Sequence, residues 1–295
     1  MKTILADAYP EQKERRYEKI TPTAYFVAYR RSLTDIPYAK EIWREFENAY
    51  PADRLKELET PQMTPQIEAR SKLLTKMMNQ VPHEQVLELA SGLSPLGLIA
   101  SQDSGVHYIE TDLPEILSRK ERLVEKLLIQ TGEKRDNLEF IPANALTLED
   151  LEKATASFDV HKPIVVIHEG LLRYLSFPEK TEVANNVRAL LEKFGGTWIT
   201  SDITLRRIIQ SENRVAEGQR ERVAKLTGIN LEQNYFDDEA QAKKFFEDLG
   251  FEVESHPFLE VEDQLVSPKL LRQTHEQVAN IMGPAAVYVM RLKSK

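Results

Sequence analysis

The sequence predicts an α/β protein with a doubly wound, mostly parallel sheet of seven strands. From residue 85 onward, short apolar segments alternate with helical segments, which is the pattern of parallel strands joined by helical crossovers. Ile164–His168 is a β-branched run typical of a central strand that helices cover on both faces. A turn of small residues, Ala90–Gly92, follows the first apolar segment, and Asp112 stands 20 residues beyond its glycine. That spacing is typical of a nucleotide-type cofactor site in such a sheet.

The first part of the chain is expected to form helices that pack on the sheet as a lid or an extra layer. Apolar side chains cluster in Ala24–Tyr29, and they recur at helical spacing in Ala39–Tyr50. Gln66–Asn79 shows the same spacing and lies just before the first strand. We therefore expect an N-terminal helical extension over residues 1–80 and a core over residues 81–295.

The core is expected to contain seven strands. Between the sixth and the seventh there is no full helical crossover of the earlier kind, so we expect a reversed strand there, at the edge of the sheet. The expected strands are Gln85–Leu89, about Val106–Glu110, Leu138–Ile141, Ile164–His168, Thr197–Ser201, Phe251–Ser255 and Ala286–Leu292.

Proline, serine and glycine mark the ends of the expected helices. A helix is predicted over Pro114–Gln130, and Gly132 follows its end closely. Another begins near Pro178, with Ser176 in position to cap it. The polar, helical segment that begins near residue 205 is too long for an ordinary loop. We expect a helical insertion over about residues 205–235, near the mouth of the site.

Composition excludes several classes of function. The net charge of −8 argues against a nucleic-acid partner, because a phosphate backbone attracts basic surfaces. The chain has no cysteine, which excludes disulfides, thiolate zinc sites and cysteine nucleophiles, and its histidines lack metal-ligand spacing, so no metal is expected. Met1–Arg16 is polar, and no apolar run approaches the ~20 residues that span a membrane. We expect a cytoplasmic protein with no membrane partner.

Polar residues follow the carboxyl ends of the predicted strands, which is where ligands bind in an open parallel sheet. The set is rich in hydrogen-bond acceptors and suits a ligand with a ribose, an amino group and an exocyclic base amine. Its members are Ala90, Ser91, Gly92, Asp112, Asn144, Ala145, His168, Glu169, Gly170, Ser201 and Asp202.

Several members of this set have an alternative, purely structural role. Asp112 can cap the helix that follows it, and this role can coexist with ribose binding. Gly92 and Asn144 can be simple turn residues, and Glu169 can be a structural residue at a strand end. His168 suits a buried histidine at a strand end, and it is also the one weak candidate for a general base.

Arg70 lies on the helix just upstream of the first strand. It is either a solvated surface arginine or a clamp for a carboxylate, for which the guanidinium fork is well shaped. A cofactor that carries both a carboxylate and an ammonium would need Arg70 together with an acid. S-adenosylmethionine is such a cofactor, and NAD is not.

Taken together, these residues resemble those of the leucine carboxyl methyltransferase family, including its bacterial members related to polyketide carboxyl methyltransferases. The similarity runs from about Thr23 to Thr204, and more weakly to the C-terminus. The combination of segments is specific, whereas the glycine turn alone would be a weak signal. The segments are Thr23–Arg30, Ile67–Arg70, Val86–Leu93, Glu110–Pro114 and His168–Leu175.

The resemblance implies a class I methyltransferase sheet with the last strand antiparallel, and S-adenosylmethionine as the methyl donor. It also implies roles for nine residues. Arg70 would hold the methionine carboxylate, and the turn of Ala90, Ser91 and Gly92 would pass beneath the methionine and the sugar. Asp112, with Leu113 beside it, would bind the ribose hydroxyls. Asn144 and Ala145 would lie near adenine, and Glu169 would face the amino group or the sulfonium.

The sequence departs from the family pattern at three positions. The family usually has glycine at the position of Ala90 and aspartate at that of Ser94, and an acid at that of Asn144. Alanine suits the turn if its φ is negative. The amide oxygen of Asn144 can still accept a hydrogen bond from the adenine amine, although as a neutral and weaker acceptor. We therefore expect cofactor binding to be retained.

The acceptor is expected to be a carboxylate or a hydroxyl, on a small molecule or at a protein C-terminus. A carboxylate is ionised at neutral pH and needs no general base, and the scarcity of candidate bases favours it. An anionic acceptor would need a positive clamp. The candidates near the expected mouth of the site are Arg30, Arg173 and Arg206, with Tyr25, Tyr29 and Tyr174 shaping the pocket.

Two other functions compete with methyl transfer. A nicotinamide-dependent dehydrogenase would have a fuller G-x-G-x-x-G motif and a catalytic Lys, Tyr or His pair, and neither is evident. A catalytically silent protein could bind the cofactor or its product as a sensor or scaffold, and the changes at Ala90 and Asn144 keep that alternative open. The sequence gives no indication of oligomeric state.

Overall fold

The structure is a computed structural model that describes residues 21–47, 63–206 and 231–294. Its central element is a seven-stranded sheet with the strand order β3-β2-β1-β4-β5-β7-β6. The strands are β1 Gln85–Leu89, β2 His107–Asp112, β3 Leu138–Pro142, β4 Ile164–His168, β5 Gly196–Thr200, β6 Phe251–Pro257 and β7 Ala286–Leu292. Most of the predicted insertion, and the end of the helix predicted over Ala39–Tyr50, lie outside the described residues.

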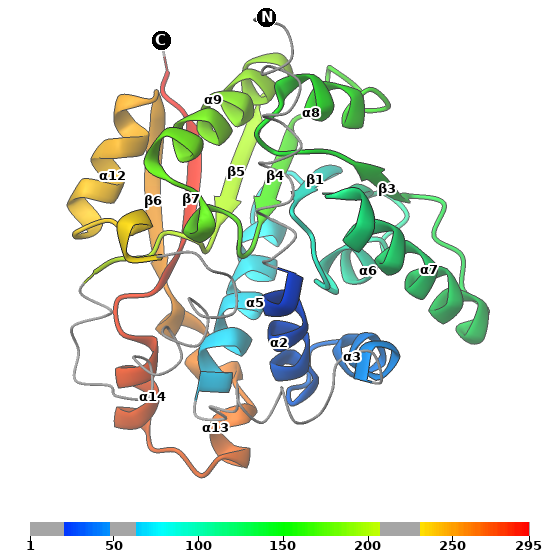
Figure 1. Cartoon of the computed structure of the whole chain (residues 1–295), viewed down its shortest axis with the longest axis vertical. Helices are drawn as coiled ribbons and strands as arrows, with labels where there is room; N and C mark the ends of the chain where they lie inside the picture. Colours follow the sequence, from blue (N-terminus) through cyan, green and yellow to red (C-terminus); the bar gives the residue numbers. More distant parts are fainter. Residues whose placement is uncertain (1–20, 48–62, 207–230, 295) are drawn as a thin grey trace, which may run out of the picture.

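The first five strands run parallel, and β7 pairs antiparallel with both β5 and β6. The prediction of an antiparallel last strand is therefore confirmed, but its predicted place at the sheet edge was wrong. Strand β7 lies inside the sheet, and β6 forms the edge (Figure 1). Along β6 the residues Glu252 and Glu254 are exposed, and such charges hinder pairing of an edge strand with another chain.

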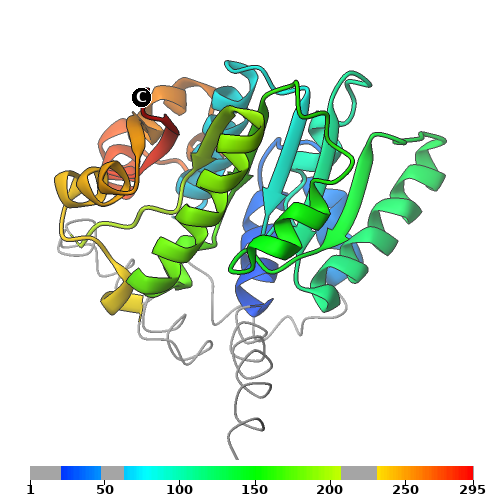
Figure 2. The ribbon, with the colours of Figure 1, turned by 90° about the horizontal axis from the view of Figure 1, so that it is seen from above.

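Helices cover both faces of the sheet, as the predicted doubly wound architecture requires (Figure 2). One face carries α8, α9 and α12, whose apolar side chains pack with Trp198 and Phe251. The other face carries α5, α6, α7 and α14, together with α2 and α3. The bounds are α2 Thr21–Ser32, α3 Ala39–Glu47, α5 Thr64–Asn79, α6 Leu96–Ala100, α7 Pro114–Thr131, α8 Leu148–Ala154, α9 Phe177–Phe194, α12 Glu239–Asp248, α13 Ser267–Leu270 and α14 His275–Met282. The 3-10 segments are η2 Leu172–Tyr174, η3 Leu231–Asn234 and η4 Phe258–Gln264.

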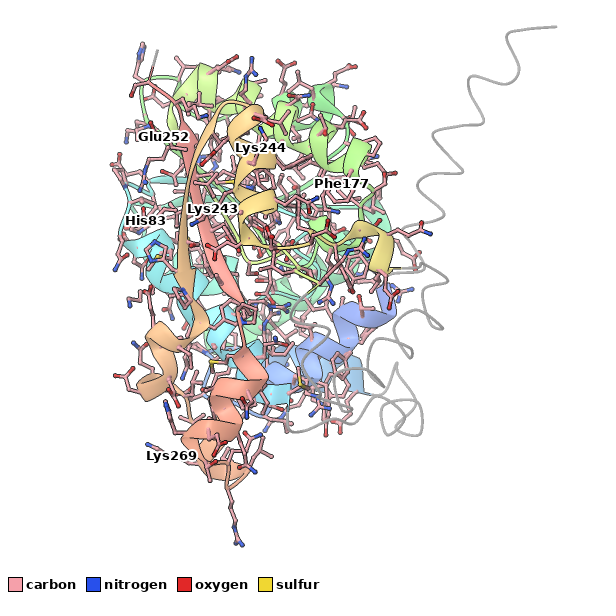
Figure 3. All side chains as sticks on the ribbon, turned by 90° about the vertical axis from the view of Figure 1, so that its left-hand side faces the viewer. His83, Phe177, Lys243, Lys244, Glu252 and Lys269 are labelled. Atoms are coloured by element: carbon pink, nitrogen blue, oxygen red, sulfur yellow. The ribbon has the colours of Figure 1, made fainter. Side chains whose placement is uncertain are left out.

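Local chemistry explains where the helices near the site begin and end. Ser176 and Glu179 form the reciprocal capping box of α9, and Pro178 occupies the first turn. Gly132 ends α7 with a left-handed φ of 71°. Figure 3 shows α12 beside β6, with Lys243 and Lys244 on it, and these two lysines pair with acids one turn away.

Helix α5 brings the N-terminal part of the chain into the core. It packs against β5 and β7, and its Leu73, Leu74, Met77 and Met78 are buried there. Helix α2 lies against α5 (Figure 1) and reaches the carboxyl ends of the central strands. Within the described residues, no helix is both long enough and apolar enough to cross a membrane.

Candidate functional site

A cavity opens at the carboxyl ends of β1, β2, β3 and β4, and α2, α5, η2 and the first turn of α7 also contribute to its lining. All nine residues that the sequence predicts for cofactor binding line it. They are Arg70, Ala90, Ser91, Gly92, Asp112, Leu113, Asn144, Ala145 and Glu169. They come from five separate segments of the chain, so the fold gathers them at the place where an open parallel sheet binds its ligand.

The turn after β1 is tight and left-handed at two residues. Gly92 has a φ of 50°, and Ala90 has a φ of 49°. The condition under which alanine suits the turn, a negative φ, is therefore not met. Left-handed backbone costs an L-residue roughly 1–2 kcal/mol, and the turn carries this strain at Ala90. The backbone of Ser91 is held in place by a 2.9 Å hydrogen bond from its N–H to the Thr111 carbonyl.

Asp112 ends β2 and is joined to the turn by hydrogen bonds. Its Oδ2 accepts from the Gly92 N–H at 2.7 Å, and its Oδ1 accepts from the Leu113 N–H at 2.7 Å. Burial raises the pKa of Asp112, and the two N–H groups oppose that rise. Each carboxylate oxygen keeps a free lone pair, so the two oxygens can accept hydrogen bonds from the two hydroxyls of a ribose.

Asn144 and Ala145 line the cavity after β3, where the adenine ring is expected. The Asn144 Oδ1 accepts a 3.0 Å hydrogen bond from the Leu146 N–H, and the Asn144 N–H donates to Asp150 at 3.2 Å. The amide oxygen that was expected to meet the adenine amine therefore already stabilises its own turn. It can take a second donor with its remaining lone pair.

Three charged side chains meet between α2, α5 and the end of β4. Arg31 and Arg70 both form ion pairs with the Glu169 carboxylate. Ser71 accepts a 3.0 Å hydrogen bond from the Arg31 Nε and lies 3.5 Å from the Glu169 carboxylate, to which its hydroxyl donates. Burial lowers the pKa of Arg31, and the charge of Glu169 opposes that effect. Two cations and one anion leave this cluster with one net positive charge, which suits an added carboxylate.

Arg31 lines the cavity but was not predicted from the sequence, which named the neighbouring Arg30 as a candidate clamp for an anionic acceptor. Consecutive helical residues point about 100° apart, and here Arg31 lines the cavity while Arg30 packs on the other side of α2. Ala24, Val27 and Arg31 line it, at spacings of three and four residues along α2. The same spacing is visible in the sequence and could have identified Arg31.

Arg30 lies on the other side of α2 and is fully buried away from the cavity. Its guanidinium donates to Thr64 at 3.3 Å and lies 5.1 Å from the Phe26 ring. Tyr25 is also outside the cavity lining, and its hydroxyl accepts from Arg119 at 3.2 Å. The predicted acceptor contacts at Arg30 and Tyr25 are therefore not supported by the structure.

Arg173 and Tyr174, the other two predicted acceptor contacts, do line the cavity. The Tyr174 hydroxyl donates to Thr23 at 3.0 Å and so joins η2 to α2. The Arg173 Nε is buried without a hydrogen-bond partner among the described residues. Arg206 and Tyr29 lie elsewhere; Arg206 pairs with Asp237 at 2.8 Å, and Tyr29 packs on Trp43.

His168, the weak candidate for a base, is fully buried and does not line the cavity. Its Nδ1 lies 2.8 Å from Asp202 Oδ2, and its ring packs on Trp198. A direct proton transfer between His168 and an acceptor in this cavity is therefore not supported. Among the described residues, the lining contains no histidine at all.

Comparison with known proteins agrees with the geometry. The sequence model of the leucine carboxyl methyltransferase family matches residues 3–188. No curated protein shows a significant match to the chain.

Solved structures share the fold at low sequence identity. A DUF574 family protein from Streptomyces avermitilis MA-4680 is 17% identical, with a TM-score of 0.55 over 92% of this chain and 97% of the other. The methyltransferase domain of bacterial CtHen1-C is 15% identical, with a TM-score of 0.50 over 79% of this chain and 100% of the domain. A candidate O-methyltransferase from Nostoc punctiforme is 14% identical, with a TM-score of 0.48; 78% of this chain is covered, but only 57% of the other.

Proposed function

This chain belongs to the leucine carboxyl methyltransferase family, and on that premise we propose that it transfers a methyl group to an oxygen atom, with a carboxylate as the favoured acceptor. It is an S-adenosylmethionine-dependent methyltransferase, and the bound cofactor supplies a methyl group on a sulfonium. The acceptor would be a small molecule or a C-terminal carboxylate. The observation that carries the proposal is the placement of the Arg31, Arg70 and Glu169 cluster in one cavity with Asp112.

Each part of this cavity has a complementary group on the cofactor. Arg70 and Arg31 would hold the methionine carboxylate, and Glu169 would balance the ammonium. Asp112 would accept from the ribose hydroxyls, while its bonds to Gly92 and Leu113 fix its orientation. These residues bind and orient, which is the main task in an in-line displacement on an already activated donor.

A carboxylate acceptor fits the rest of the lining. It is already ionised at neutral pH, so a histidine base is not required. Arg173 faces the cavity and could pair with it, because its guanidinium has an Nε without a partner among the described residues. Tyr174 and Thr23 close the cavity beside it.

Calorimetric titration with S-adenosylhomocysteine, on the wild type and on Arg70→Ala, tests the cofactor site. We expect micromolar binding to the wild type and at least a hundredfold loss in the variant, because a desolvated charge pair is removed. Arg188→Ala is the control, since Arg188 pairs with Glu192 on the exposed face of α9. Equal affinity of Arg70→Ala and the wild type would contradict the assignment.

The acceptor type is tested by the chemistry of the product. Methyl label transferred from the cofactor to a carboxylate forms an ester, which mild alkali hydrolyses to labelled methanol. Methyl ethers formed from hydroxyls are stable under the same treatment. Alkali-stable label would therefore refute the carboxylate proposal while leaving the methyltransferase assignment intact.

A catalytically silent cofactor-binding protein is the second candidate. Two observations favour it: the strained left-handed Ala90 and the engagement of the Asn144 oxygen in its own turn. This candidate predicts that the protein binds S-adenosylhomocysteine but does not form it from S-adenosylmethionine in the presence of any acceptor. Formation of S-adenosylhomocysteine from S-adenosylmethionine in the presence of a carboxylic acid would exclude this candidate.

A further inference from the structure

The segment that follows β4 is held by one buried carboxylate, that of Asp202 just beyond β5. Its Oδ1 accepts from the Gly170 N–H at 2.5 Å. Its Oδ2 accepts from the Leu171 N–H at 2.6 Å and from the Leu172 N–H at 3.2 Å. Three consecutive backbone donors thus converge on a side chain that is only 3% exposed. Backbone groups of a loop rarely have a single charged acceptor in common, and the arrangement fixes the path of this segment.

His168 supplies a fourth bond to the same carboxylate. Its Nδ1 lies 2.8 Å from Asp202 Oδ2 and 3.1 Å from the Thr200 hydroxyl, which in turn accepts from the Asp202 N–H at 3.1 Å. The ends of β4 and β5 are joined in this way. Neither Asp202 nor His168 lines the cavity, so their effect on a ligand must pass through other residues.

The segment that Asp202 holds carries two residues of the cavity. Glu169 stands between His168 and Gly170, and both of these neighbours are bonded to Asp202. Arg173 follows Leu172, whose N–H is the last of the three donors. Gly170 has a φ of 89°, a conformation that gives the segment its sharp change of direction directly after Glu169.

We propose that Asp202, assisted by His168, is a positioning residue for methyl transfer: it fixes Glu169 against Arg31 and Arg70 and sets the place of Arg173. This inference rests on the proposed cofactor role of Glu169. A carboxylate is required because it offers two oxygens with about four lone pairs, and four donors point at it. An asparagine would offer one oxygen and would place its own NH₂ group against a backbone N–H.

Asp202→Asn separates positioning from simple support of the fold. We expect its Kd for S-adenosylhomocysteine to rise at least tenfold, because Glu169 and the arginines lose their fixed arrangement. Val187→Ala is the matched control, since Val187 is fully buried on α9 and does not line the cavity. It should lower the melting temperature while its folded form keeps the wild-type Kd.

Amide hydrogen exchange gives a readout that does not depend on any ligand. In Asp202→Asn the N–H groups of Leu171 and Leu172 should exchange faster than in the wild type, while those of β1 keep their protection. In Val187→Ala the Leu171 and Leu172 amides should change no more than those of β1.

A pair of His168 variants covers the case in which Asp202→Asn does not fold, because the three backbone bonds remain in both. His168→Asn keeps a donor near the Nδ1 position, and His168→Leu removes it. The Kd should rise more in His168→Leu than in His168→Asn.

Two results would overturn the inference, and they are distinguishable. If Asp202→Asn binds S-adenosylhomocysteine as tightly as the wild type, the positioning role fails and the cofactor site stands. If Asp202→Asn does not fold, the same conclusion follows when both His168→Asn and His168→Leu bind as tightly as the wild type. If the wild type itself binds none, the proposed function fails and the positioning role fails with it.

Discussion

The carboxylate of Asp112 is bonded to the backbone of Gly92, with 2.7 Å between Oδ2 and the N–H. The acid expected at the ribose and the turn expected beneath the methionine are therefore one rigid unit, although 20 residues separate them in the chain. This unit requires an N–H at position 92, and glycine, which has no side chain, leaves room there for the ligand.

Arg31 and Arg30 should behave differently when each is replaced by alanine. Arg31→Ala should raise the Kd for S-adenosylhomocysteine at least tenfold, because the cluster around Glu169 loses one of its two cations. Arg30→Ala should lower the free energy of unfolding but leave that Kd within about twofold, since Arg30 packs away from the cavity. Calorimetry and urea unfolding on both variants check this, and a larger loss of affinity in Arg30→Ala would reverse the assignment.

Ala90→Gly should stabilise the protein modestly. Relief of the left-handed strain at a φ of 49° should raise the free energy of unfolding by roughly 1–2 kcal/mol. The added freedom of glycine in the unfolded chain should lower it by about 0.4–1 kcal/mol. The net gain in unfolding free energy should be about 0.5 kcal/mol, measured by chemical denaturation. Gly92→Ala, at a φ of 50°, is the reciprocal variant and should be destabilised. A loss of stability in Ala90→Gly would mean that the alanine methyl contributes more by packing than its backbone costs.

Gly97→Ala should be strongly destabilising. A Cβ on Gly97 would lie 2.2 Å from Glu110 Oε1, and Glu110 is fully buried in an ion pair with Lys120. Relieving the clash requires that pair to move within a packed core, which we expect to cost at least about 2 kcal/mol. Gly105→Ala is the control, because its Cβ would meet only the exposed Asp103 side chain. Thermal unfolding of the two variants distinguishes these cases, and equal melting temperatures would contradict the buried contact.

Asp202 should make the stability depend on pH in the acid range only. Burial works to raise the pKa of this carboxyl, but the hydrogen bond and charge of His168 and the backbone N–H groups of Gly170 and Leu171 more than offset it, and the pKa falls to about 2. A carboxyl with a lowered pKa stabilises the fold above its unfolded pKa of about 3.9 and loses that stabilisation as the pH falls towards the folded value.

The wild type should therefore lose about 2 kcal/mol of unfolding free energy from this group between pH 4 and pH 2. Asp202→Asn cannot titrate and should lack that part of the acid dependence. Urea unfolding at several pH values from 5 downward gives the comparison. If the unfolding free energy of the two proteins changed equally with pH, Asp202 would not have the lowered pKa.

Much of the fold was predictable because its signals are local. The run Ile164–His168 and the strand Gln85–Leu89 are apolar segments bounded by turn residues, and both begin and end where expected. The place of β7 between β5 and β6 was not predictable, because strand order depends on pairing between distant segments. The short helix α8 was not predicted, because its seven residues are too few to show a clear helical period of apolar residues.

The site shows the same division between local and distant information. Asp112 was identified by its spacing from Gly92, and Arg70 by its place on the helix before the first strand and by the family resemblance; both line the cavity. Arg30 was named and Arg31 was not, although Arg31 has the helical spacing of Ala24 and Val27, which also line the cavity. The left-handed φ of Ala90 could not be predicted, because a run of small residues does not determine the handedness of a turn.

The walls of the cavity come from segments that are far apart in the chain. Arg31 meets Glu169 across 138 residues, and Thr23 meets Tyr174 across 151. Closing such long loops is entropically costly and slow, so we expect these contacts to form after the nearer strand pairs. In a refolding experiment, affinity for S-adenosylhomocysteine should therefore return later than the circular dichroism of the helices.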